Sequence, residues 1–120
     1  MIAIQLIAHG SWRDEANADL EEVATRLRER SDYGFIVASY LEIADPSIPV
    51  AARLCVAAGA TEVLLMPYFL SAGSHVTRDL QRFRDELNAE FAGVKFRLCP
   101  PLGLHQLMLD IICDRLGEAE

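Results

Sequence analysis

The sequence has little of what several classes of protein need. It contains one lysine and carries a net charge of −7, so it lacks the clustered basic side chains that bind nucleic-acid phosphates, and we exclude nucleic acid as a partner. No apolar run approaches the roughly 18 residues that span a bilayer, and the first residues lack the basic region and cleavage site of a signal peptide. We therefore expect no membrane association and a soluble, cytoplasmic protein.

Cysteine is scarce as well. Cys55, Cys99 and Cys113 lie far apart, form no C-x-x-C pair and stand beside apolar residues, which indicates reduced thiols rather than a redox or metal centre. The hydrophobic fraction of 52% and the charged fraction of 24% are ordinary for a globular chain. With 120 residues there is room for one core, so we expect a single domain over residues 1–120.

Short apolar segments alternate with amphipathic ones along the whole chain. Four segments have the length and composition of strands: residues 2–8, 35–41, 62–67 and 94–98. Each is followed by apolar residues at helical spacing, within residues 16–27, 51–58, 76–91 and 104–112. This alternation, with short connections, predicts an α/β domain: a four-stranded parallel sheet of the flavodoxin-like kind, flanked by helices.

Polar side chains follow three of the predicted strands. His9 comes directly after the first strand, Glu42 closes the second, and His75 lies in the loop that leaves the third. Ligands of open parallel sheets bind beyond the carboxyl ends of the strands, so these three side chains should meet at one rim. Each also has a structural explanation: a turn histidine, a solvated acid and a first-turn helix residue. His105, at the start of the last helix, is expected to pack or to cap.

Two imidazoles and a carboxylate around an open space suit a divalent metal ion. Nitrogen and oxygen ligands bind cobalt, nickel, iron(II) or zinc, and a partial ligand set leaves coordination positions free. The same groups accept protons near neutral pH. The loops Gly10-Ser11 and Gly73-Ser74 place small residues near helix N-termini, where backbone N–H groups attract carboxylates or phosphates. Neither loop has a nucleotide-binding fingerprint.

Four segments together resemble a known family. "LIAHGSWRDEAN", "SYLEIADPSIP", "EVLLMPYFLSAGSHVTRDL" and "PPLGLHQLM" are similar, in order and spacing, to the short form of the sirohydrochlorin chelatases, the CbiX-type cobaltochelatases and SirB-type ferrochelatases of class II. The resemblance runs from the first strand to the last helix. Its most specific part is F-L-x-x-G-x-H-V-x-x-D-L after the third strand.

The resemblance implies that the protein is an enzyme, a sirohydrochlorin metal chelatase of tetrapyrrole and cobalamin biosynthesis. It would insert a divalent metal, cobalt first and nickel or iron as alternatives, into sirohydrochlorin without ATP and without a permanently bound cofactor. His9, His75 and Glu42 would be the catalytic and metal-binding residues. Ring carboxylates would be bound by Gly10, Ser11, Arg13, Gly73 and Ser74, with Arg78 as a further candidate. Short members resemble half of the longer ones, which implies a homodimer.

The chain departs from the family in the first loop. Trp12 and Asp14 stand where the family often has Arg and Pro, and Arg13 is displaced by one position, which puts substrate preference in doubt. A carrier that binds metal or tetrapyrrole without turnover would have much the same sequence. A histidine phosphatase would need Arg where Ala8 stands, and a receiver domain would need an acidic cluster at the position of His9.

Overall fold

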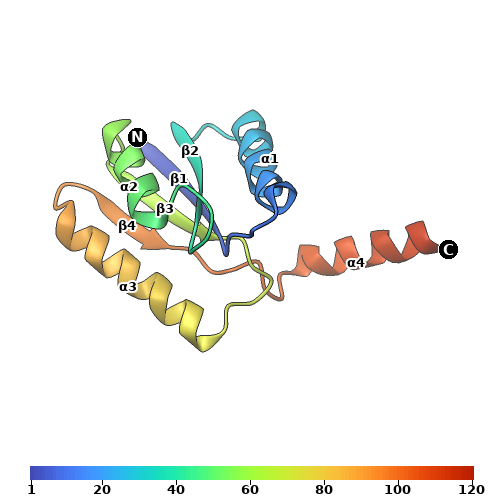
Figure 1. Cartoon of the computed structure of the whole chain (residues 1–120). Coiled ribbons are helices and arrows are strands. Elements are labelled where there is room, and N and C mark those ends of the chain that lie inside the picture. Colours follow the sequence, from blue (N-terminus) through green and yellow to red (C-terminus); the bar gives the residue numbers. More distant parts are fainter.

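The structure, a computed structural model, describes residues 1–120 and follows the predicted alternation of strands and helices (Figure 1). The strands are β1 (Ile2–Ala8), β2 (Phe35–Tyr40), β3 (Glu62–Pro67) and β4 (Lys95–Leu98). The helices are α1 (Asp14–Arg30), α2 (Ile48–Ala57), α3 (Ser74–Glu90) and α4 (Gln106–Ala119). The predicted α/β fold class is therefore confirmed.

All four strands run parallel, in the order β2-β1-β3-β4. The register aligns the carboxyl ends of the first three strands, because Ala8 lies beside Tyr40 and Ile7 lies beside Pro67. A helix joins each of the first three strands to the next, since parallel neighbours can be joined only by a crossover. The loops that leave β1, β2 and β3 consequently begin at one level and form a common rim.

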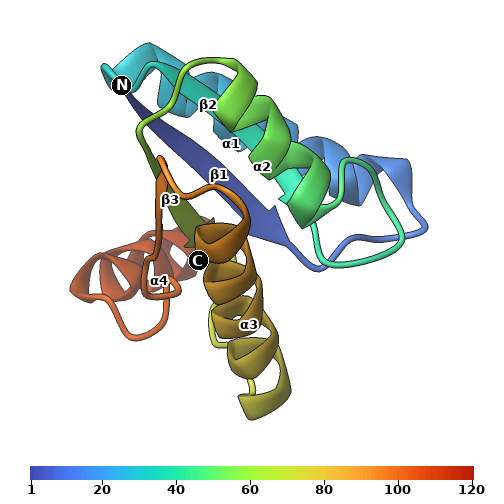
Figure 2. The same cartoon turned by 90° about the vertical axis from the view of Figure 1, so that its left-hand side faces the viewer.

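Helices cover both faces of the sheet (Figure 2). Alternate side chains of β1 point to opposite faces. Ile4 and Leu6 belong to a cluster with Leu20 and Ala24 of α1. Ala3 and Ile7 belong to the larger cluster on the other face, which α2 and α3 cover; the helix residues of that cluster are Ile48, Ala52, Cys55, Leu80 and Leu87. The two clusters fix β1 from both sides, so its carboxyl end is a rigid base for the first loop.

Helix α4 projects away from the rest of the domain (Figure 1). It buries no residue, and the molecule measures 53 × 32 × 28 Å along its principal axes. Its start is capped by His105, whose Nδ1 accepts a hydrogen bond of 3.1 Å from the Leu107 N–H, so the expected cap is confirmed. Large apolar side chains are left exposed: Leu107, Leu109, Ile111, Ile112 and Leu116. None of the four helices has the length and apolar character needed to cross a bilayer.

Candidate functional site

His9 and Glu42 are brought together by the adjacent strands β1 and β2. Beyond the strands, the Leu41 N–H donates to the carbonyl of Ala8 at 2.9 Å, and the Glu42 N–H donates to the carbonyl of His9 at 3.1 Å. Strand β2 ends at Tyr40, so Glu42 lies two residues past the strand rather than at its last position. The His9 ring stands 4.5 Å, centre to centre, from the ring of Phe69, a buried residue that follows β3.

A tight turn fixes the backbone of Glu42. The Ala44 N–H donates to the Glu42 carbonyl at 2.8 Å, and Ile43 between them has a φ of 73°, a left-handed conformation that is strained for a β-branched residue. Gly10 lies directly against this turn, because a Cβ added to it would stand 1.9 Å from the Glu42 carbonyl oxygen. Only glycine fits there, and its φ of 95° is a left-handed backbone conformation that also favours glycine.

A cavity of about 300 Å³ opens between this pair and helix α3. His9 and Glu42 line it together with Asp79 and Arg82, and Leu41, Val76 and Phe83 complete its wall. Sequence reasoning missed Asp79 and Arg82 as site residues. The signals were present: Asp79 is the aspartate of the H-V-x-x-D-L motif and follows Val76 by three residues, and Arg82 follows Asp79 by three, so each neighbours the one before it on the helix surface.

The charges on α3 beside this cavity are paired with each other. Arg82 Nη2 lies 3.3 Å from Asp79 Oδ1, and Arg82 Nη1 lies 3.5 Å from Glu86 Oε1. The guanidinium also stacks over the Phe83 ring, 4.9 Å from its centre. These ion pairs are exposed and therefore weak, so Asp79 can exchange Arg82 for a cation that enters the cavity.

His75 lies in the exposed first turn of α3 and does not line this cavity. No group of three or more His, Cys, Asp or Glu side chains stands close enough together to hold a metal ion. The structure therefore brings together His9 and Glu42, and the role of His75 as a third ligand stays a prediction. Gly73 precedes the helix with an ordinary φ of −65°, and a Cβ there would meet nothing within 4 Å.

The first loop is held by Asn17 of α1. The Ser11 N–H donates to Asn17 Oδ1 at 3.0 Å, and Asn17 Nδ2 donates to the Ser11 carbonyl at 2.9 Å. The Ser11 hydroxyl oxygen accepts from the Arg13 N–H at 3.1 Å. The Ser11 N–H, which was expected to be available to an anion, is thus already used, whereas the Ser11 hydroxyl proton remains free to donate. The Arg13 side chain forms an exposed ion pair of 3.6 Å with Glu15.

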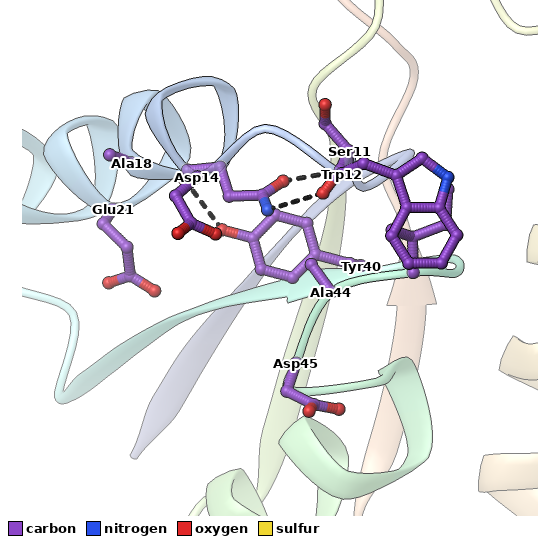
Figure 3. Close-up of a pocket in the computed structure, with 10 residues that line it drawn as sticks. Ser11, Trp12, Asp14, Ala18, Glu21, Tyr40, Ala44 and Asp45 are labelled. Atoms are coloured by element: carbon purple, nitrogen blue, oxygen red, sulfur yellow. Dashed lines mark hydrogen bonds between the residues drawn. The ribbon is translucent and has the colours of Figure 1, made fainter.

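A second cavity, of about 420 Å³, lies on the other side of the Glu42 turn, against α1 (Figure 3). Trp12 stands at its edge, and Tyr40 forms part of its wall and donates to the Asn17 carbonyl at 2.9 Å. Burial, with a smaller contribution from Glu21, raises the pKa of the Tyr40 hydroxyl. This hydroxyl therefore stays protonated at neutral pH and keeps its hydrogen bond to α1.

The fold and rim define an α/β domain that presents a histidine and a carboxylate just beyond neighbouring parallel strands, as the position of the strand ends predicted. The sequence model of the CbiX family matches residues 3–119, and the chain belongs to this family.

Named relatives agree with this assignment. The chain is 37% identical over 113 residues to the chloroplastic sirohydrochlorin ferrochelatase of Arabidopsis thaliana. The match covers 94% of this chain and 50% of that protein. The chain is 30% identical over 125 residues to the sirohydrochlorin cobaltochelatase of Sulfurisphaera tokodaii, covering 98% and 93% of the two chains. The sirohydrochlorin chelatase SirB from Bacillus subtilis subspecies spizizenii, solved with cobalt, has the same fold with a TM-score of 0.89 at 20% identity. That match covers 98% of this chain and 50% of SirB, so the chain spans about half the length of SirB and of the Arabidopsis enzyme.

Proposed function

We propose that the protein inserts a divalent metal ion into sirohydrochlorin. The observation that supports this most is the pairing of His9 with Glu42 around an open cavity, in a chain of the CbiX family. Insertion forms bonds from the metal to ring nitrogens and breaks two pyrrole N–H bonds, whose protons must be accepted. An imidazole and a carboxylate at one opening are suited to bind the incoming ion and to take up these protons.

His75 and Asp79 complete the proposed set. His75 stands on the first turn of α3, the helix that forms the other wall of the cavity, and serves as an additional ligand for the ion in transit. Asp79 lies in the cavity itself and attracts the cation. The metal is a substrate and no cofactor is permanently bound. Imidazole and carboxylate accept cobalt, nickel and iron(II) alike. Relatives include a ferrochelatase and a cobaltochelatase, and we retain cobalt as the first candidate.

The carboxylates of the macrocycle would be bound at the two loops. At the first loop, the Ser11 hydroxyl and the Arg13 guanidinium are available, since the ion pair of Arg13 is exposed and weak. The Gly10 backbone shapes this loop. At the second loop, Gly73 and Ser74 stand at the start of α3, where the helix dipole favours negative charge.

A homodimer is part of the proposal. Relatives of twice the length support it, because one copy of this chain supplies half of their structure. The exposed apolar residues of α4 support it as well, since such patches mark interaction surfaces. An apolar cavity of about 470 Å³ beside Met66, Cys99 and Ile111 lies open at the base of α4, and Met66 belongs to the face of the sheet that α1 covers. We assign the second copy to this surface. A cytoplasmic location stays a prediction, because one relative is chloroplastic.

The test is catalytic turnover. Sirohydrochlorin and Co²⁺ are mixed anaerobically with substoichiometric protein, and the absorbance of the ring is followed beside a protein-free control. We expect faster conversion over many equivalents, lost in His9→Ala and His75→Ala. His105→Asn is the matched control, because it removes the third histidine while keeping a side chain that can cap α4.

The same mixture separates the alternative function. Tight, stoichiometric binding of ring or metal with a rate equal to the protein-free control would identify a carrier instead of an enzyme. Repeating the assay with Ni²⁺ and Fe²⁺ at equal concentration ranks the metals by kcat/KM. Because His105 also lines the cavity assigned to the second copy, a His105→Asn variant that keeps the oligomeric state of the unchanged protein and is as inactive as His9→Ala would contradict the assignment of the site to the rim.

A further inference from the structure

Trp12 is unusually exposed for its type. It is the only tryptophan of the chain, and 85% of its surface is accessible, although tryptophan is among the more buried residues on average. It follows β1 by four positions, at the same rim as His9. No core residue covers its ring, so folding gains little from the indole at this place.

The backbone that carries Trp12 is nevertheless held firmly on both sides. Asn17 bonds both main-chain groups of Ser11, and the Ser11 hydroxyl accepts from the Arg13 N–H, so the residues before and after Trp12 are fixed. Asn17 is itself fastened by Tyr40, whose hydroxyl donates to its carbonyl. An exposed aromatic ring on a fixed backbone is a binding anchor that loses little entropy when a ligand covers it.

Ile43 is a second exposed apolar residue, and it lines the 420 Å³ cavity together with Trp12. It is 45% accessible and occupies the left-handed position of the Glu42 turn, where an isoleucine is strained. Glu42 lines the 300 Å³ cavity with His9. Ile43, its neighbour in the chain, lines the 420 Å³ cavity with Trp12. The turn is thus a shared wall, and a flat ligand held at His9 and Glu42 that extends over this wall reaches Ile43 and then Trp12.

We infer that Trp12 and Ile43 form an apolar shelf that supports the face of the macrocycle while His9 and Glu42 act at its centre. This inference rests on the proposed function. The carboxylates of Asp14, Glu21 and Asp45 line the same cavity and repel the carboxylated edge of the ring, so the shelf contacts the ring face. Trp12 is a substrate-positioning residue and takes no part in metal binding.

Binding of metal-free sirohydrochlorin tests the shelf separately from turnover. The dissociation constant is measured for the unchanged protein, Trp12→Ala, Trp12→Phe and the control Tyr33→Ala, an exposed aromatic beside the opposite ends of the strands. Ring fluorescence reports binding in every variant, and quenching of the single tryptophan reports it in the unchanged protein. Sedimentation velocity gives the oligomeric state of each, and circular dichroism its folding.

We expect Trp12→Ala to weaken binding about tenfold, Trp12→Phe by less than about threefold, and Tyr33→Ala to bind like the unchanged protein. In turnover, Trp12→Ala should raise KM by a similar factor and leave kcat within about twofold. Unchanged binding by Trp12→Ala would overturn the shelf even if the protein is a chelatase. A Trp12→Ala variant that dissociates an otherwise dimeric protein would also overturn it, and would assign Trp12 to the contact between copies.

The two proposals can fail separately. If the unchanged protein binds the ring through Trp12 but does not insert metal faster than the protein-free control, the shelf stands and the chelatase function fails. If it neither binds nor converts the ring, both are refuted. Ring binding that survives in Trp12→Ala, together with normal turnover, leaves the function intact and removes only the shelf.

Discussion

Replacing Gly10 with alanine tests whether the contact between the first two loops organises the site. The new Cβ would stand 1.9 Å from the Glu42 carbonyl oxygen, against an ordinary contact of at least 3.4 Å, so the loops must separate by about 1.5 Å. The φ of 95° adds about 1–2 kcal/mol for a residue with a Cβ. Overpacking adds about 1–3 kcal/mol, which gives a total loss of roughly 2–5 kcal/mol in the free energy of unfolding.

Gly59→Ala is the matched control for this change. Gly59 has a φ of 98°, but a Cβ there would meet nothing within 4 Å, so it carries the backbone cost alone. Urea denaturation of both variants therefore isolates the clash at Glu42.

Gly10→Ala should also lower kcat/KM for metal insertion by about a hundredfold, since a displacement near 1 Å of reacting groups has that effect. A Gly10→Ala variant that is no less stable than Gly59→Ala and keeps its turnover would refute the proposed contact and its role.

Three further changes probe the loops, the core and the surface of α4. Asn17→Ala removes both bonds to Ser11 and should cost about 1–3 kcal/mol in urea denaturation and increase acrylamide quenching of the single tryptophan; equal quenching would show that Asn17 does not hold the loop. Burial raises the pKa of Cys55 from 9.0 to about 12, so its neutral thiol stabilises the fold below pH 9, and this stability falls by about 1.4 kcal/mol per unit from pH 9 toward 12. The slope should be absent in Cys55→Ala, and a slope that persists there belongs to other groups. Ile111→Asp should shift the sedimentation of a dimer to that of a monomer, whereas Asp114→Ala on the same helix should not.

The alternation of strands and helices and the rim could be predicted from the sequence because both depend on local patterns, whereas the order β2-β1-β3-β4 was not predicted. Buried parallel strands are apolar on both faces, and each was followed by a helical stripe, so the sheet and the position of its carboxyl edge could be predicted. The edge then placed His9 and Glu42 at one opening. The pairing required no knowledge of side-chain geometry, since adjacent parallel strands in register must end together.

Features that depend on tertiary contact could not be predicted in the same way. The left-handed conformation of Ile43 contradicts the preference of its residue type, and it occurs in a turn that lies directly against Gly10 of the other loop. The exposed position of α4 could not be predicted either. An apolar stripe shows that a helix has a face to bury, but not whether its own sheet or another molecule covers that face. Asp79 was visible in the motif, but only the direction of α3 places it in the cavity with His9.

The two glycine-serine loops look equivalent in the sequence and differ in the structure. Gly10 lies directly against the Glu42 carbonyl, and the N–H and the carbonyl of Ser11 are both hydrogen-bonded to the Asn17 side chain. The backbone that follows His9 is therefore held in place. Gly73 has free space around its Cα, and the buried residues of α3, Leu80 and Leu87, lie one or more turns further along the helix. In the first turn itself, Val76 is partly buried and packs against the core, whereas His75 is exposed. The two loops therefore present their histidines differently: His9 follows a strand and stands beside a loop that hydrogen bonds hold in place, whereas His75 stands on an exposed helix turn.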